Sequence, residues 1–586
     1  MRKLPLALFG AASIFLAAPA FAGPVEDFHA LMDDYWAAML KESPLLATSA
    51  GVKTYDSQLD ELSLQAMDRQ AGLAKAFLDR LNAIPQSALP ATDQTNYAIL
   101  RRTLQTSIEG NRFGQRQMLY STLGSYHDYY AGIGETQPFH DKGDYENYLK
   151  RIALVPERMR SYGEISVKAA NEGYVQPCVT LTRFPDTISG NISADPAKSR
   201  FYAPFAGEKP GNISQADWDS LKARAAALIR DRINPSYESF ARLYAEQLAT
   251  KCRQDVAVSS LPQGKDYYAF LVRNYTTTEL TPAQIHALGL KEVARIRADM
   301  ETVAKKAGFA SREAMIADMR TNPKWYVTTP EALLEATALQ AKVIDGKMPS
   351  LFTRLPRLPY GIRPMAAATA PGDTTARYQP GSPDAGVAGF YLVNTTKLDQ
   401  RPLWEIPALT VHEAVPGHHM QIATQQELEM PAWRKYGSFF TAFSEGWGLY
   451  SERLGIEMGL YDTPQKDMGR LGYEMWRAAR LVVDTGIHSK GWSKEQAVAF
   501  MKDNTTLTDA NIDAEVNRYI SNPGQALAYK IGELKIRELR TKAERELGAK
   551  FDLRRFHDAV LGQGSVPLDA LEAQIGAWIN AEKARR

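Results

Sequence analysis

The chain has 586 residues, more than one compact hydrophobic core usually contains, so the sequence predicts two or three subdomains. Apolar residues make up 45% and charged residues 23% of the chain; these are ordinary globular values and argue against a disordered or low-complexity protein. The formal net charge is only +2 and no basic stripe is present, so we expect no nucleic-acid partner.

The first 22 residues have the pattern of a cleaved export signal. Arg2 and Lys3 form a positive start, residues 4–18 are apolar, and residues 20–22 read Ala-Phe-Ala, a small-x-small cleavage site. The apolar run is short for a membrane anchor, and no later stretch is apolar enough to span a bilayer. No cysteine stands at the cleavage site, so a lipid-anchored form is not expected. We therefore expect a periplasmic or secreted protein without a stable membrane span after cleavage.

Cys178 and Cys252 are the only two cysteines. An exported protein can pair them in a disulfide, and two buried free thiols are an equally weighted alternative. In either case the chain has too few cysteines for a metal site built from thiolates.

Apolar periodicity predicts helices through the first half of the mature chain. Leu73, Phe77, Leu78 and Leu81 recur at helical spacing. Thr281 and Ser493 each precede a Gln by three residues, as in a capping box, and Thr281 and Thr329 are each followed by Pro at the first helical position. The expected helical stretches are 24–115, 143–172, 214–250 and those that start after Thr281 and Thr329, with an irregular stretch at 174–213.

A break rich in Pro and Gly occupies residues 348–389. Phe390–Asn394 then has the composition of a short strand, and from about residue 404 the pattern is helix after helix. The fold class expected is mainly α, a multi-helical metallopeptidase-like architecture with a small β-sheet beside the active-site helix. The expected division is a signal peptide at 1–22, an N-terminal mostly helical region at 23–347 and a C-terminal catalytic region with the metal site at 348–586.

Three of the nine histidines fall within eight residues, at His412, His418 and His419. Glu413 follows His412 directly, and the six residues before His412 are largely apolar. Burying such a His-Glu pair costs free energy unless a partner neutralises it. A metal ion, with a carboxylate that activates water, supplies that partner.

The spacing of these histidines departs from the usual zinc-peptidase helix, in which two histidines are four residues apart. On a straight helix His418 would lie about 120° around from His412, and His419 would lie roughly 10.5 Å along the axis. Neither position lets both rings reach one zinc ion. Pro416, however, cannot donate an N–H to the carbonyl of residue 412, and Gly417 tolerates almost any backbone angle. A distortion at this point is therefore predicted to swing His418 back beside His412, and His419 is expected to point away from the metal.

The segment from His412 to His418, followed by Gln421, resembles the signature of the domain-of-unknown-function family numbered 885. That family looks like a branch of the gluzincin-type zinc metallopeptidases, and dipeptidyl-peptidase III shows a similar device with a shorter insertion before its second histidine. The resemblance covers most of the mature chain. Its other motifs here are Asn274–Thr278, Leu288–Leu290, Ser444–Trp447 and Pro523–Leu527.

The resemblance implies that the third zinc ligand is a Glu on a later helix, and Glu445 matches it. The surroundings favour the same residue, because Gly446 and Gly448 let another backbone come close. Glu452 lies on the same helical face and could orient His412 or His418. The alternative is a surface helix with two solvated glutamates.

Zn²⁺ held by His412, His418 and Glu445 keeps one position open for water, and Glu413 is the expected general base. Something must also stabilise the oxyanion that forms on the substrate. We favour His488 and Tyr519 together for this role. Other assignments stay open: Asp484 orients His488 or pairs with Arg480, Arg480, Asp484 and His488 form an ordinary ion-pair ladder, or Tyr529 replaces Tyr519.

The function expected is that of an exported zinc metallopeptidase acting on peptides or oligopeptides. Phe390–Asn394 is a candidate sheet edge for an extended substrate. Arg518 and Lys530 are candidates for binding a substrate carboxylate, and ordinary surface positions explain them equally well. Two other functions remain open: a peptide-binding protein with an inactive site, and a metallohydrolase of a non-peptide amide.

Overall fold

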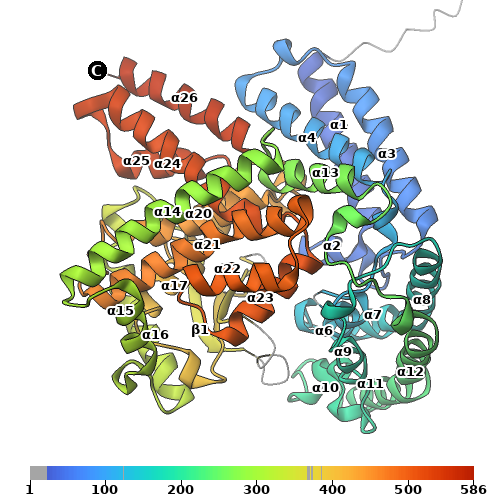
Figure 1. Cartoon of the computed structure of the whole chain (residues 1–586). Coiled ribbons are helices and arrows are strands. Elements are labelled where there is room, and N and C mark those ends of the chain that lie inside the picture. Colours follow the sequence, from blue (N-terminus) through green and yellow to red (C-terminus); the bar gives the residue numbers. More distant parts are fainter. Residues whose placement is uncertain (1–22, 123, 366–369, 371–373, 384–385, 586) are drawn as a thin grey trace, which may run out of the picture.

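The computed structural model describes residues 23–585, except 123, 366–369, 371–373 and 384–385. The expected signal peptide, residues 1–22, lies outside the described residues. The chain is mainly helical with one small sheet, which confirms that part of the expected fold class (Figure 1). Among the described helices, none is both long and apolar enough to cross a bilayer.

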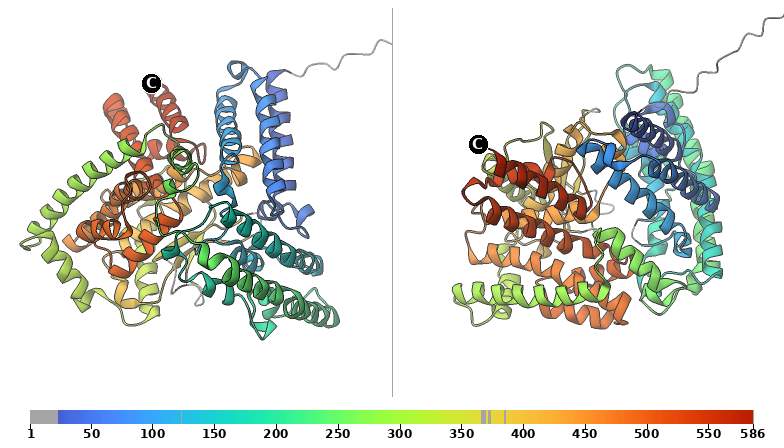
Figure 2. Two further views of the ribbon diagram at one scale, coloured as in Figure 1. Left: turned by 45° about the vertical axis from the view of Figure 1, so that its right-hand side comes forward. Right: turned by 90° about the horizontal axis from the view of Figure 1, so that it is seen from above.

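The N-terminal helices pack on the half of the chain that carries the histidine cluster. On α3, Phe77 and Leu81 are buried, as the periodicity predicts. They belong to one hydrophobic core with Trp447 and Ile531 of the C-terminal half. These helices form one corner of the molecule, next to α13 (Figures 1 and 2). Their bounds are α1 Pro24–Glu42, α2 Pro44–Ser49, α3 Leu64–Asn82 and α4 Ala91–Gly110.

The next eight helices surround a separate core, made of residues between Leu45 and Leu248. A disulfide joins Cys178 to Cys252 at the edge of this body, which settles the alternative left open by the sequence. The stretch expected to be irregular, 174–213, contains only short helices. The bounds are α5 Tyr126–Ala131, α6 Ile133–Thr136, α7 Lys142–Ile152, α8 Val155–Asn171, α9 Phe184–Ser189, α10 Ala203–Ala206, α11 Gln215–Leu228 and α12 Asn234–Leu243.

Four helices then lead back to the C-terminal half: α13 Gly264–Thr276, α14 Pro282–Lys306, α15 Arg312–Thr321 and α16 Pro330–Asp345. The predicted caps are present, since Thr281 forms a capping box and Thr329 accepts a hydrogen bond from the N–H of Ala332. Helix α14 packs along α21 (Pro464–Lys490), and the two share a core. The hydrophobic cores therefore cross the expected boundary at 347/348.

The sheet has three strands, β1 Tyr360–Pro364, β2 Ala376–Gln379 and β3 Gly389–Val393, in the order β1-β3-β2. β3 matches the strand expected at Phe390–Asn394, but it pairs with β1 in parallel and with β2 antiparallel. A strand paired on both sides has no free backbone edge. The expectation that this strand binds an extended substrate is therefore wrong, and a substrate that adds to this sheet has to pair with β1 or β2.

The C-terminal half is a bundle around α17, α20, α21 and α24. All eight residues of α17 are buried, because α17 packs between β2, α16, α20 and α21. The bounds not yet given are α17 Ile406–Glu413, α18 His418–Glu427, α19 Ala432–Gly437, α20 Thr441–Leu454, α22 Lys494–Asn504, α23 Asp509–Ser521, α24 Ala528–Leu547, α25 Leu553–Leu561 and α26 Leu568–Ala584.

Candidate metal centre

The chain breaks its helix at the predicted point. α17 ends at Glu413 and α18 begins at His418, so the four residues between them form a turn that contains Pro416. The N–H of His419 bonds to the carbonyl of Ala414 across the turn, at 3.1 Å. A Cβ at Gly417 would lie 1.9 Å from the carbonyl oxygen of His412, so only glycine fits there. The distortion is thus a full break between two helices, larger than a two-residue bulge.

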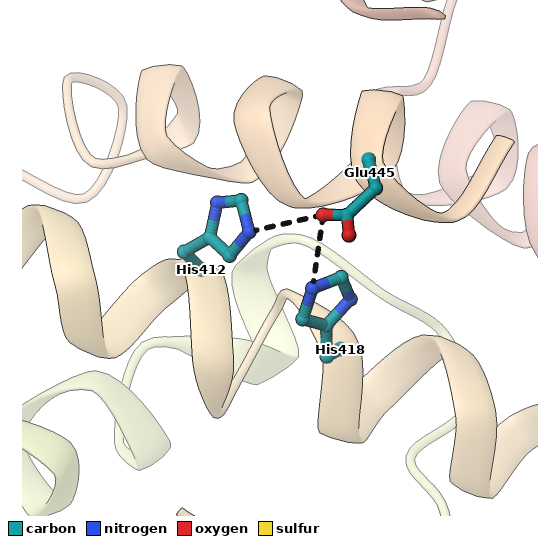
Figure 3. Close-up of side chains that lie close together, drawn as sticks. All are labelled: His412, His418 and Glu445. Atoms are coloured by element: carbon teal, nitrogen blue, oxygen red, sulfur yellow. Dashed lines mark ion pairs between the residues drawn. The ribbon is translucent and has the colours of Figure 1, made fainter. Parts of the chain in front are cut away.

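This break brings His412 and His418 together with Glu445 of α20 (Figure 3). The ring centres of the two histidines are 4.8 Å apart, and the ring planes are perpendicular. The Oε2 atom of Glu445 lies 3.6 Å from Nε2 of His412 and 3.4 Å from Nε2 of His418. All three ligand atoms lie within 4.8 Å of one another. The side chains of His418 and Glu445 are 14% and 17% exposed, so the cluster is reachable from solvent.

Two glycines of α20 make room for this arrangement. A Cβ at Gly448 would lie 2.8 Å from the His412 ring, so any larger residue would displace the imidazole. A Cβ at Gly446 would lie 2.5 Å from Cα of Gly532, because α20 and α24 touch backbone to backbone at this point. The expected close approach of another backbone near Glu445 is therefore present.

Glu452 holds the His412 ring from behind, as its helical position predicts. Its Oε1 atom lies 2.8 Å from Nδ1 of His412. Arg477 of α21 lies 3.2 Å from the same oxygen and keeps Glu452 paired. Since Nδ1 is turned toward Glu452, Nε2 is the ring nitrogen that faces Glu445 and would bind a metal ion there.

The electrostatics of the cluster favour a positive charge between the three side chains. Burial opposes the charged form of His412, but hydrogen bonds to Glu445 and Glu452 outweigh it and raise the pKa of His412 to about 9. Burial likewise opposes ionisation of Glu445, yet the two histidines hold the pKa of Glu445 well below its usual value. Glu413, at the end of α17, adds a further negative charge that acts on His412.

His419 points away from the cluster, as expected. Its Nδ1 atom lies 2.9 Å from the hydroxyl of Tyr378 on β2, and its ring packs against Tyr360 on β1, with ring centres 4.8 Å apart. Burial lowers the pKa of His419 to about 4, so the ring is neutral at neutral pH. His419 therefore joins α18 to the sheet.

The structure does not bring His488 to the cluster. His488 is fully buried; its Nδ1 accepts from the N–H of Val258 and its Nε2 bonds to the carbonyl of Tyr519, at 3.0 and 2.9 Å. Both ring nitrogens are thus used by backbone groups, and none is left for a substrate. Asp484 contacts neither His488 nor Arg480; it accepts from the hydroxyl of Tyr268 and the N–H of Gly524.

Tyr519 also lies behind the cluster. Its hydroxyl donates to Glu515 at 2.6 Å and accepts from Arg480 at 3.1 Å. Burial and the charge of Glu515 raise the pKa of Tyr519 above its ordinary range. The phenol is therefore committed to a buried network on α21 and α23 and does not face a substrate.

Tyr529, the alternative to Tyr519, is the tyrosine that lies beside the cluster. Its ring stacks near His412 with centres 6.5 Å apart and planes at 21°. Burial and the nearby carboxylate of Glu445 raise the pKa of Tyr529, so the phenol keeps its proton. Tyr529 is the second residue of α24, which begins directly after the motif Pro523–Leu527. This position was the feature of the sequence that pointed to it.

Lys530 does not fit a substrate-binding role. Its side chain is fully buried, and its ammonium group lies 3.2, 2.9 and 2.9 Å from three carboxylates, those of Glu292, Glu474 and Glu533. Arg518, in contrast, is partly exposed near Tyr529.

The three side chains fit a zinc ion. Ligand atoms about 2.0–2.1 Å from a tetrahedral ion lie roughly 3.3–3.4 Å from one another. The two His–Glu distances are close to that value, and the largest separation in the cluster, 4.8 Å, has to shorten when an ion binds. Two imidazoles and one carboxylate are a common donor set for catalytic zinc. The outward hydrogen bond from His412 to Glu452 is the arrangement that metal-binding histidines usually make.

Two solved structures resemble the whole chain. A protein from Colwellia psychrerythraea, provisionally described as a lipoprotein, matches with 26% identity and a TM-score of 0.89, covering 95% of this chain and 100% of that one. A protein of unknown function from Shewanella oneidensis, also provisionally described as a lipoprotein, matches with 18% identity and a TM-score of 0.65, covering 94% and 99%. The second likeness shows the fold alone. No curated protein matches the chain.

A family model described as "Bacterial protein of unknown function (DUF885)" matches residues 44–575. That range contains all three clustered side chains, the turn at Pro416 and the paired glycines of α20 and α24. The chain therefore belongs to the DUF885 family of bacterial proteins.

Proposed function

We propose that this protein is a zinc-dependent peptidase, with His412, His418 and Glu445 as the ligands. The single observation that carries the proposal is the convergence of Nε2 of both histidines on one oxygen of Glu445. Ordinary core histidines have their ring nitrogens bonded to neighbours, as His488 has. Here two rings and a carboxylate converge in a cluster that solvent reaches, and a shared cation would satisfy all three side chains at once.

Bound zinc supplies Lewis-acid polarisation of a substrate carbonyl and lowers the pKa of a coordinated water to about 7. Glu413, next to His412 on the last turn of α17, is the base that accepts a proton at its carboxylate from the attacking water. Glu452 keeps His412 in one orientation through Nδ1. The phenol of Tyr529 is the hydrogen-bond donor to the oxyanion, in place of His488 and Tyr519.

An exported location is part of the proposal. The first 22 residues have the pattern of a signal, and the two structural relatives are described as lipoproteins. The disulfide between Cys178 and Cys252 fits an oxidising compartment. A peptide is the proposed substrate, because the zinc-water chemistry cleaves amide bonds and the donor set matches that of zinc peptidases.

Elemental analysis of the purified mature protein, after mild dialysis, tests the proposal first. We expect about one zinc ion per chain, lost in His412→Ala and kept in the control His29→Ala, whose side chain is 53% exposed and pairs with Asp93. The zinc-loaded protein should then cleave members of a fluorogenic peptide library. Absence of zinc, with none taken up when it is added, would exclude the proposed function and favour a peptide-binding protein.

A further inference from the structure

A cluster of buried charges beside Tyr529 contains more positive than negative groups. Arg480 of α21 and Arg518 of α23 share one carboxylate, that of Glu515, whose Oε2 lies 2.9 and 3.2 Å from their Nη2 atoms. The same oxygen also accepts from the hydroxyl of Tyr519 and the indole of Trp476. This oxygen of Glu515 thus accepts from four donors, two of which belong to guanidinium groups.

Both guanidinium groups keep donors that are not used. Within the described part of the chain, the buried Nη1 of Arg480 and the buried Nε of Arg518 have no hydrogen-bond partner. Arg480 is only 3% exposed, and a buried guanidinium without enough acceptors is costly. This cost suggests that an anion from outside the chain completes the cluster.

Neighbouring acids do not remove the surplus charge. Glu452 is paired with Arg477, and Glu445 faces the two histidines. Asp484 is bonded to Tyr268 and Gly524, and burial raises the pKa of Asp484 to about 7, so it carries only part of a charge at neutral pH. The cluster therefore retains close to one uncompensated positive charge, the amount that a single carboxylate neutralises.

The cluster lies next to the candidate metal centre. The guanidinium carbon of Arg480 is 4.5 Å from the centre of the Tyr529 ring, whose other neighbour is the His412 ring at 6.5 Å. Arg518 donates from Nη1 to Oε1 of Gln525 at 3.4 Å, and both side chains act on the Tyr529 phenol. The side chain of Arg518 is 21% exposed, so a ligand can reach it.

We propose that Arg518, supported by Gln525 and Tyr529, binds the free α-carboxylate of a peptide, so that the enzyme cleaves close to the C-terminus of its substrate. Arg480 supports the same subsite from behind through its charge. Tyr529 lies between Arg518 and the His412 ring, so the subsite is close to the candidate metal centre, and only a few residues of a substrate fit between the two. The substrate class is thus peptides with a free C-terminus, and the enzyme releases one or a few residues at a time.

This inference rests on the proposed peptidase function, and its test is chosen to separate the two. The Glu413→Gln protein, loaded with zinc, is titrated by calorimetry with two peptides of one sequence, a free acid and its C-terminal amide. We expect the acid to bind roughly 10- to 100-fold more tightly, because a charge-assisted pair with a guanidinium replaces a neutral contact.

Substitutions in the same background then locate the contact. Arg518→Met should remove the preference for the acid, and Arg518→Lys should restore part of it, because Lys keeps the charge without the fork of donors. Arg224→Met is the matched control, since Arg224 pairs with Glu146 on the separate helical body. Should Arg518→Met fail to fold, the acid and amide comparison with Arg518 intact still decides.

Equal binding of acid and amide would overturn the carboxylate subsite, even if zinc and peptide cleavage are found. A preference for the acid that survives Arg518→Met would also overturn it. Acid-selective binding that depends on Arg518, in a protein that cleaves no peptide with Glu413 restored, would support the subsite and contradict the peptidase.

Discussion

Two groups of histidine and acid in the C-terminal half differ in what their ring nitrogens contact. In the cluster on α17, α18 and α20, Nε2 of His412 and Nε2 of His418 face one carboxylate oxygen. In the group on α21, both nitrogens of His488 are bonded to backbone groups. Spacing in the sequence made both groups candidates for chemistry. The difference teaches that a ring nitrogen free of structural partners is a better sign of a ligand than spacing alone.

The largest effect on zinc binding should come from His418, which belongs to the cluster. We expect His418→Ala to lower zinc affinity by more than about 100-fold, because it removes a ligand, whereas His419→Ala should keep the metal. Zinc content after dialysis against a weak chelator measures both. Metal loss in His419→Ala with retention in His418→Ala would mean that the wrong histidine has been assigned.

Glu413→Gln should lower kcat by about 10²- to 10⁴-fold, because the amide cannot accept the proton of the attacking water. Zinc content should stay unchanged, since Glu413 is not among the three converging side chains. Steady-state kinetics on a cleaved peptide, with metal analysis of the same sample, checks this. A fully active Glu413→Gln protein would remove the residue from the mechanism.

Glu452→Gln should weaken zinc binding by about 10- to 100-fold, because the amide holds the His412 ring less firmly and no longer carries a charge. The matched control is Glu457→Gln, because Glu457 lies just after the end of α20 and pairs with Arg540 of α24 instead of with a histidine. Competition with a chromogenic chelator measures the affinity. Equal affinities for the two variants would show that Glu452 only pairs with Arg477.

His488→Ala tests the other side of the comparison. We expect it to lower the free energy of unfolding by about 3 kcal/mol, because an N–H and a carbonyl lose their buried partners. Zinc content and kcat per folded molecule should not change. Urea unfolding and kinetics measure the two effects, and a large loss of kcat without a loss of stability would return His488 to the catalytic residues.

The smallest effect concerns pH. Burial raises the pKa of Asp484 from 3.8 to about 7, so the folded protein holds this proton more tightly than the unfolded chain does. The contribution of Asp484 to the free energy of unfolding is therefore largest below about pH 4, and it falls as the pH rises toward 7. Asp484→Asn avoids that loss, so it should gain about 1–3 kcal/mol relative to the native protein between pH 4 and pH 8. Urea unfolding at both pH values measures this; a pH-independent difference would contradict the raised pKa.

The sequence predicted the local chemistry better than the distant contacts. Pro416 and Gly417 predicted the distortion that turns His418 toward His412, and helical spacing predicted Glu452 behind them. These inferences depend on covalent geometry within a few residues. The strands β1 and β2 were missed, because four or five residues inside a stretch rich in Pro and Gly give no clear alternation.

The roles of His488 and Tyr519 could not be read from spacing, because spacing says which residues share a helical face and not what that face meets. Almost every residue of α21 from Met468 to His488 is buried, so each face of that helix meets core. For the same reason, spacing could not show that Tyr529, and not Tyr519, lies beside the cluster. Its place beside His412 follows from the contact between α20 and α24, which are some 80 residues apart in the chain.

The contact between α20 and α24 limits how the sequence can evolve. Gly446 and Gly532 touch so closely that a methyl group on either would collide with the opposite backbone, at 2.5 and 1.8 Å. Substitution of either glycine would separate α20, which carries Glu445, from α24, which carries Tyr529. Glu445 and Tyr529 are therefore held in one register, and mutational paths that alter one glycine without rebuilding the other helix pass through destabilised intermediates.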